Sequence, residues 1–544
     1  MILAWKKARH ADLAFAIGLG LLALGLRLPW TGKVLGESDC ARFLIGLRQW
    51  LHLGAGAAGI YDKTLCPGFY WLAGIFLHWG GTVRMLARVS AWVTASDMLP
   101  VYWMGRNWLR PLEAGLAASF WMLAPGWWWL GLEVHPEAWA LAAGLWALWA
   151  WLEFWRRGGL TTSRGWIWLA GALGLLSCML LLDAGLAPWA GAFWGISLAG
   201  TAKNSSRPAC APTTPPRRRG LLRGTIATAG LWLAAACIFW LARRAILGAA
   251  LMPGSTRHTL AQFWQWPQGV QWLKQLLPLA TALGLGSWLL IAFGLLFLGM
   301  AKILWTRTHA IAKPHDSTSA AGLKELWLVC LCWSLPGWIF WLLVRGNNVR
   351  HVVIYSLPWL WLGMRGWRAA RGWQPVAAAG LLAANFWLIP ANSNLTLYPS
   401  GNVPASRRDF QRKQAVMRQV ALRLARPSRE PNAARGGVCY LGLSTNPYLE
   451  YLLLRQPDAR IMSAPGGMQV VMAGGQSITF FDITSAAAWR AGRARCASAY
   501  SLEFGLGRKH LWFMGNEWRN LPAHRRWYAA ASSPVLLPAP REQP

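Results

Sequence analysis

The sequence predicts an all-α polytopic membrane protein with a small mixed α/β domain at its C-terminal end. Two features of the composition indicate this class: 55% of the 544 residues are apolar, and only 14% are charged. Soluble domains carry about 25% charged residues, and long apolar runs account for the difference here. A third feature, a polar C-terminal segment, divides the chain into a transmembrane domain, 1–391, and a second domain, 392–544.

The net charge of +34, from 54 Lys and Arg against 20 Asp and Glu, does not indicate nucleic-acid binding. The basic residues lie mainly in short loops between apolar runs and in the C-terminal segment. Membrane topology and contact with anionic lipid explain this placement. We therefore expect the lipid bilayer, and no nucleic acid, as the partner of these charges.

The first apolar run covers 11–28 and follows Lys6, Lys7 and Arg9. This opening resembles a signal peptide, but no clear small-x-small cleavage site follows it. The run is about as long as a full bilayer span. We expect an uncleaved first helix whose N-terminus lies in the cytoplasm.

Further apolar runs bring the predicted total to about eleven spans. The weakest pair is 166–182 and 184–200, because Asp183 and Pro188 interrupt one long apolar stretch. The complete set after the first span is 82–104, 112–130, 138–155, 166–182, 184–200, 224–247, 277–301, 325–344, 351–364 and 373–391.

The positive-inside rule supports this number of spans, because it places the most basic loops on the cytoplasmic side. A single span over 166–200 would instead put Arg217–Arg219 outside. The outward segments are then 30–81, 131–137, 248–276, 345–350 and everything after about residue 392.

The C-terminal domain combines helical and strand-like patterns. An amphipathic basic helix near 407–426 precedes strand-like runs at 438–443, 469–472 and 478–483, which Gly, Pro and Asn separate. Its basic charge is compatible with an outward position, because long translocated domains largely escape the positive-inside rule.

Two outward segments carry acidic side chains suited to chemistry. Asp39 lies in the long segment 30–81, where a carboxylate is a candidate general base or metal ligand, although a solvated loop is the simpler role. The turn 131–137 places Glu133, His135 and Glu137 at the mouth of the next helix. Pro136 and Glu137 also suit a helix start, so a helix cap is the alternative role of Glu137.

Arginines gather on the same predicted face. Arg345 and Arg350, followed by His351, lie in the outward link, and the planar guanidinium of arginine suits a phosphate. A lipid-headgroup anchor explains them equally well. Arg84 and Arg88, at the outer end of the second span, add to this group or simply extend their charged ends to the interface.

Several of these motifs, taken in their order, resemble the start of a GT-C membrane glycosyltransferase. The branch is that of the protein O-mannosyltransferases and the lipid A aminoarabinose transferases, and the resemblance covers residues 10–200 and, more loosely, 345–390. The segments that carry it are Asp39 with Phe43, Cys66-Pro-Gly-Phe-Tyr-Trp71, Trp79-Gly-Gly81, Arg88-Val-Ser90, Tyr102-Trp-Met-Gly-Arg106 and Arg350-His351 ahead of Tyr355-Ser-Leu-Pro358.

The resemblance implies transfer of a sugar from a polyprenyl-phosphate-linked donor to an extracytoplasmic acceptor by a multi-pass protein of the cell inner membrane. Asp39 inherits the role of catalytic carboxylate, which takes the proton of the acceptor hydroxyl as the sugar C1 gains oxocarbenium character. Two positions depart from the family pattern: Cys40 replaces the Glu that often follows the Asp, and His351 replaces the usual Tyr.

The remaining polar residues receive supporting roles from the same resemblance. Arg350, with Arg345 or Arg88, would stabilise the departing lipid phosphate. Glu137 would orient the acceptor or share a divalent cation with Asp39, and the need for a metal is left open. The other candidate substrate-binding residues are Glu133, His135, Tyr70 and His351.

The cysteines allow two disulfides if the outward face is oxidising. Cys40 and Cys66 share the first outward segment, and Cys439 and Cys496 share the C-terminal domain. Two pairs of thiols are the alternative.

Three other functions remain open. A transporter or flippase for lipid-linked sugars predicts acids within the membrane and paired broken helices, and Asp97 and Asp183 are the candidate acids. A non-catalytic envelope assembly protein predicts that Asp39 is replaceable. A ligase that uses a pyrophosphate-linked donor is the third, and the sequence leaves the sugar, the acceptor and the oligomeric state undetermined.

Overall fold

The structure is a computed structural model of the whole chain, and it divides into two compact units. Unit 1 comprises Met1–Thr31, Thr64–Leu72 and Arg84–Asn392, and unit 2 comprises Gly32–Lys63, Ala73–Val83 and Ser393–Pro544. The residues described are 2–31, 38–55, 65–132, 134–157, 159–205, 216–248, 283–308, 317–343, 354–367 and 376–385, followed by the C-terminal helix and strands named below and a few single positions near them.

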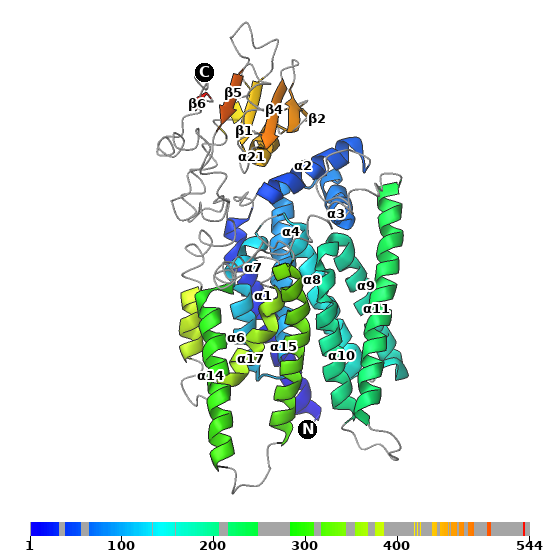
Figure 1. Cartoon of the computed structure of the whole chain (residues 1–544), viewed down its shortest axis with the longest axis vertical. Helices are drawn as coiled ribbons and strands as arrows, with labels where there is room; N and C mark the ends of the chain where they lie inside the picture. Colours follow the sequence, from blue (N-terminus) through cyan, green and yellow to red (C-terminus); the bar gives the residue numbers. More distant parts are fainter. Residues whose placement is uncertain are drawn as a thin grey trace. The chain divides into compact units, whose positions relative to one another are not determined.

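Unit 1 is a bundle of helices (Figure 1). Helices occupy every predicted span, while the number that crosses a bilayer stays a prediction. Their bounds are α1 (Ile2–Arg27), α4 (Val83–Ser96), α5 (Met98–Gly105), α6 (Pro111–Met122), α7 (Pro125–Leu130), α8 (Pro136–Arg156), α9 (Ser163–Leu182), α10 (Ala190–Ser205), α11 (Pro216–Leu247), α14 (Leu285–Thr308), α15 (Ser317–Leu343), α17 (Leu357–Trp367) and a helix over Val376–Asn385.

The predicted interruption between 166–182 and 184–200 is confirmed. The helix α9 ends at Asp183, whose backbone is extended (φ −159°), and a 3₁₀ turn over Ala184–Trp189 leads into α10. Two further spans are also divided, since α4 and α5 meet at Asp97, and α6 ends before α7 begins at Pro125. Proline stands in the first turn of α7, where its missing N–H breaks no helical hydrogen bond.

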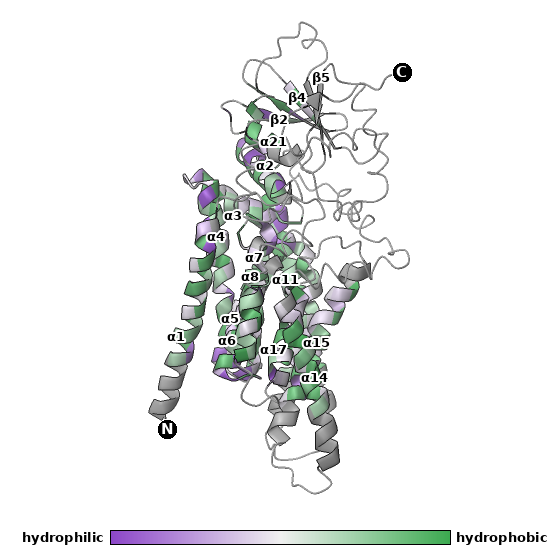
Figure 2. Ribbon diagram, turned by 90° about the vertical axis from the view of Figure 1, so that its left-hand side faces the viewer, coloured by the Kyte–Doolittle hydropathy of each residue, from purple (hydrophilic) through white to green (hydrophobic). Residues whose placement is uncertain are grey.

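The outer surface of the bundle is apolar. Two helices of the described chain are long and apolar enough to span a membrane, Ser163–Leu182 and Leu222–Leu247, and only 17% of the second is buried. Exposed side chains along it include Leu222, Ile226 and Leu233. Contiguous apolar surface of this kind marks a membrane or interaction site, and Figure 2 shows hydrophobic residues along much of these helices. We treat the bundle as membrane-embedded.

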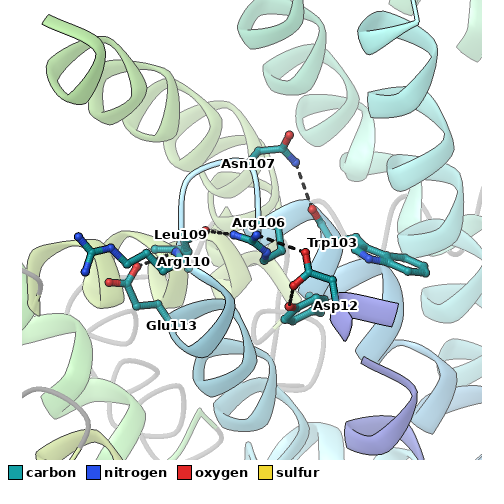
Figure 3. A network of polar contacts seen from close by, with 8 residues as sticks. Asp12, Trp103, Arg106, Asn107, Leu109, Arg110 and Glu113 are labelled. Atoms are coloured by element: carbon teal, nitrogen blue, oxygen red, sulfur yellow. Dashed lines mark hydrogen bonds and ion pairs between the residues drawn. The ribbon is translucent and has the colours of Figure 1, made fainter. Parts of the chain in front are cut away.

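A polar network joins Asp12 of α1 to α5 and to the link between α5 and α6 (Figure 3). The Tyr102 hydroxyl and the Arg106 guanidinium both donate to the Asp12 carboxylate, at 2.9 and 3.3 Å. Arg106 also donates to the Leu109 carbonyl at 2.8 Å, and the Arg110 backbone N–H donates to the Glu113 carboxylate at 2.9 Å. These contacts fix the link that the sequence places in the cytoplasm.

The C-terminal part of unit 2 contains a six-stranded mixed sheet in the order β2-β3-β4-β1-β5-β6. Strand β1 is parallel to β4 and β5, and the other neighbours are antiparallel. Its elements are β1 (Val438–Gly442), α21 (Asn446–Leu453), β2 (Arg460–Ala464), β3 (Gly467–Val471), β4 (Ser477–Asp482), β5 (Ser498–Ser501) and β6 (Leu537–Pro538).

The strand-like runs at 438–443, 469–472 and 478–483 correspond to β1, β3 and β4, whereas the sequence analysis did not find β2, β5 or β6. The basic helix expected near 407–426 falls almost entirely outside the described residues.

The segment 30–81, which the sequence predicts to face outward, is not simply a long loop, and this corrects the sequence analysis. It contains α2 (Ser38–Leu53) and α3 (Pro67–His78). The span criterion could not find them, because helices of 16 and 12 residues are too short to cross a bilayer. Of these, α2 belongs to unit 2, together with the C-terminal sheet.

Candidate functional site

The start of α8 brings a carboxylate to one end of the bundle. Helix α8 begins at Pro136, and Glu137 lies in its first turn with a side chain that is almost completely buried. The helix start predicted at Pro136 and Glu137 is therefore confirmed. The N-terminal position favours a negative charge there, because the helix dipole and unpaired backbone N–H groups point toward it.

His135 accompanies this carboxylate. It precedes α8 in an extended conformation (φ −134°), and its side chain is fully buried. Its Nδ1 lies 3.9 Å from Oε2 of Glu137, close enough for a charge pair when the imidazole is protonated. A buried histidine beside a carboxylate can hold a proton or release it during a reaction.

The first turns of α3 lie beside this pair. The ring of Phe69 meets that of Trp139 on α8 edge-on, with centroids 5.5 Å apart. Trp139 in turn donates from Nε1 to the Ser90 hydroxyl of α4 at 2.7 Å. The predicted binding residue Tyr70 follows Phe69 and is fully buried. Segment 65–72 thus packs where α8 begins, and Tyr70 belongs to the same end of the bundle as Glu137.

Asp183 lies at the junction of α9 and the following 3₁₀ turn, at the interruption that the sequence predicts. Its Oδ1 accepts a hydrogen bond from the Gly185 N–H at 2.8 Å, and the next residue, Ala184, donates its N–H to the Leu65 carbonyl at 2.9 Å. The side chain is only 8% exposed. Asp183 is therefore a second carboxylate that adjoins segment 65–72.

Arg27, at the end of α1, is a buried cation that the sequence analysis did not single out. Its guanidinium donates to the Thr94 hydroxyl at 3.0 Å and to the Met122 carbonyl at 3.3 Å, and it lies over the Trp128 ring at 5.5 Å. It is fully buried and interacts electrostatically with Asp97. Arg27 thereby ties α1 to α4, α6 and α7.

The turn before α8 rests directly on this cation. A Cβ at Gly131 would lie 2.5 Å from the Thr94 hydroxyl and 3.3 Å from the Arg27 guanidinium carbon. Only glycine therefore fits the close approach of turn 131–137 to Arg27.

The remaining candidate site residues lie elsewhere or outside the described part of the chain. Arg88 is exposed on α4. Asp39 lies in the first turn of α2 and belongs to unit 2, so the structure assigns it to a different unit from Glu137, and its side chain is not described. Four candidates fall outside the described residues: Glu133, Arg345, Arg350 and His351.

Two further predicted features of the site are its disulfides and a metal ion. Cys40 and Cys66 are both buried, and the disulfide between them stays a prediction. Cys496 and the side chain of Cys439 are not described. Within the described part of the chain, no group of three His, Cys, Asp or Glu side chains is arranged to hold a metal ion.

No family model and no curated protein matches the chain. Similar solved structures include the Archaeoglobus fulgidus oligosaccharyltransferase in complex with zinc and sulfate, at 13% identity over 81% of this chain and 61% of that one, with a TM-score of 0.44. The same enzyme tethered to an acceptor peptide with the NVT sequon gives 14% identity, 83% and 64% coverage and a TM-score of 0.44. The chain thus spans less than two thirds of that enzyme's length.

A second similar protein is ArnT from Cupriavidus metallidurans bound to undecaprenyl phosphate. It is 13% identical over 81% of this chain and 84% of that one, with a TM-score of 0.44. At these values the likeness is one of general architecture, and the assignment of function rests on the residues of this chain.

Proposed function

We propose that the chain is an integral membrane glycosyltransferase that moves a sugar from a polyprenyl-phosphate-linked donor to an extracytoplasmic acceptor. The observation that carries the proposal is the buried Glu137 and His135 at the start of α8, beside the segment that holds Tyr70. These groups lie at one end of a bundle with an apolar outer surface. An apolar carrier would lie along such a surface, and its phosphate and sugar would meet the polar groups at the end.

In the proposed reaction, the acceptor hydroxyl loses its proton to the carboxylate of Asp39. The hydroxyl oxygen bonds to the sugar C1 as the bond from C1 to the phosphate oxygen breaks, and the lipid phosphate leaves with that electron pair. General base catalysis of this kind contributes about 10²–10⁴ in rate. The protein, lipid or glycan class of the acceptor is left open.

The supporting roles follow from chemistry and place in the chain. Arg345 and Arg350, with the exposed Arg88, would stabilise the charge on the departing phosphate. Glu137 would orient the acceptor. The Nδ1 of His135 lies 3.9 Å from Oε2 of Glu137, and when the imidazole is protonated its positive charge would stabilise the ionised form of that carboxylate.

The test is glycosyl transfer from polyprenyl-phosphate sugars in purified membranes, with Asp39→Asn compared with wild type at matched expression. We expect a loss of about two orders of magnitude or more, with donor binding kept, because the amide cannot accept the proton. Asp62→Asn, a carboxylate change in the same outward segment, is the control and should retain activity. Equal activity of Asp39→Asn and wild type would remove Asp39 from the mechanism and redirect attention to Glu137.

A transporter of lipid-linked sugars is the second candidate, and one observation favours it. Asp97 is fully buried where α4 gives way to α5, and within the described residues neither of its carboxylate oxygens has a hydrogen-bond partner. Buried acids at helix breaks are typical of transport pathways. A wild-type protein that fails to transfer sugar, but translocates lipid-linked sugar in proteoliposomes in an Asp97-dependent manner, would establish this alternative.

A further inference from the structure

The helix that carries Asp39 is part of the hydrophobic core of the C-terminal domain. Ala41 and Ile45 of α2 belong to one buried cluster with Leu449 and Leu453 of α21. The other main members come from the sheet and its connections: Val470, Met472, Ile478 and Phe480. All of these residues lie in unit 2. A segment from the start of the chain and a domain from its end therefore fold as one body.

The register of α2 separates the two faces of this helix. Ala41 and Ile45 are four residues apart and so lie on the same face, which packs into the cluster. Asp39 precedes Ala41 by two residues, which at about 100° per residue places its Cα on the opposite side of the helix. The distance along the axis is only about 3 Å. The packed face of α2 therefore fixes where position 39 stands.

We propose that the C-terminal domain positions the catalytic helix, with Ile45, Leu449 and Leu453 as the positioning residues for Asp39. This inference rests on the proposed function, and it gives the C-terminal domain a role in catalysis. A catalytic base must lie within hydrogen-bond reach of the proton that it accepts. A displacement of about 1 Å can cost about 10²-fold in rate. The α2–α21 packing supplies the constraint that keeps Asp39 in place.

The first experiment compares Leu453→Ala with wild type in the full-length protein in membranes. The cavity beneath Ile45 should lower kcat by about 10–100-fold, with the donor KM changed less than about twofold. Leu453→Met, which keeps most of the volume, should restore kcat. Met462→Ala is the matched control, because Met462 is 54% exposed on β2 of the same domain and its truncation leaves the cluster intact.

A second measurement does not depend on activity. Amide hydrogen exchange of residues 40–53 should become faster in Leu453→Ala and Ile45→Val, and should remain unchanged in Met462→Ala. Unchanged exchange of α2 in Leu453→Ala would overturn the inference. Faster exchange with an unchanged kcat would show that the domain holds α2 without positioning Asp39, and would also overturn it. If wild type shows no transfer, the proposed function fails by itself, and with it the catalytic role given to this packing.

Discussion

The buried cation Arg27 joins four helices of the bundle, α1, α4, α6 and α7, whereas the buried carboxylate Glu137 lies in the first turn of one helix, α8. Glu137 was found because an acid after a proline marks a helix start, and the structure places it there. Arg27 was missed, because a single arginine at the end of an apolar run is typical of a charge at the membrane interface. Its contacts with Thr94 and Met122 join segments 67 and 95 residues away in the chain, and no local pattern predicts such contacts.

Arg27 and Asp97 are both buried, and we expect substitution of both residues to lower the free energy of unfolding less than substitution of Arg27 alone. Arg27→Met removes the hydrogen bonds to the Thr94 hydroxyl and the Met122 carbonyl and the positive charge that the buried Asp97 faces, and should lower the free energy of unfolding by about 1.5–3 kcal/mol. Arg27→Met combined with Asp97→Leu removes both charges and should cost clearly less than Arg27→Met alone. Thermal unfolding in detergent measures both. A double variant as unstable as the sum of the single variants would show that the two charges do not interact.

At the scale of elements, apolar run length predicted the helices of the bundle and the break at Asp183, because both signals are local. The same criterion overlooked α2 and α3, whose lengths are too short for a span. The strand β5 was overlooked because it has only four residues and pairs with β1, which is distant in the chain. The strand β2 is as long as β1 and β3 and pairs with β3 in a local hairpin, so its length does not explain why it was overlooked. The parallel pairing of β1 with β4 and β5 likewise depends on contacts that no local pattern contains.

Turn 131–137 provides a prediction at this scale. Gly131→Ala adds a methyl group that must displace Thr94 or Arg27, so α8 should start from a shifted position. We expect a loss of stability of about 1–3 kcal/mol and reduced sugar transfer, because His135 and Glu137 move with the turn. Gly171→Ala is the control, since a Cβ there has nothing within 4 Å on α9. Unfolding temperature and transfer rate check both variants, and equal behaviour of the two would contradict the close fit at Gly131.

For the whole molecule, the decisive relation is between charge and topology. The segment 203–223 carries six arginines and lysines and covers the end of α10, the connection and the start of α11, and its predicted side of the membrane depends on whether α9 and α10 are separate. With α9 and α10 as separate helices, the predicted number of spans before this segment is even, and under that prediction the positive-inside rule places the segment and the N-terminus in the cytoplasm. The segment after residue 392 follows an odd number of predicted spans and belongs on the opposite side.

Thiol labelling tests this topology directly. In a chain that retains only Cys210, which lies in the basic loop, a membrane-impermeant maleimide should fail to label intact cells and should label permeabilised ones. In an otherwise cysteine-free chain, Ser393→Cys should be labelled in both, because the predicted topology places the C-terminal domain outside. If Cys210 were labelled from outside, every later loop would lie on the side of the membrane opposite to the predicted one. The C-terminal domain would then lie in the cytoplasm. The helix α2, which carries Asp39, comes before Cys210 in the chain, so its predicted side would not change. The helix α2 and the sheet that it packs against would then be assigned to opposite sides of the membrane. Their common core excludes that arrangement, because Ile45 and Leu453 occupy one buried cluster.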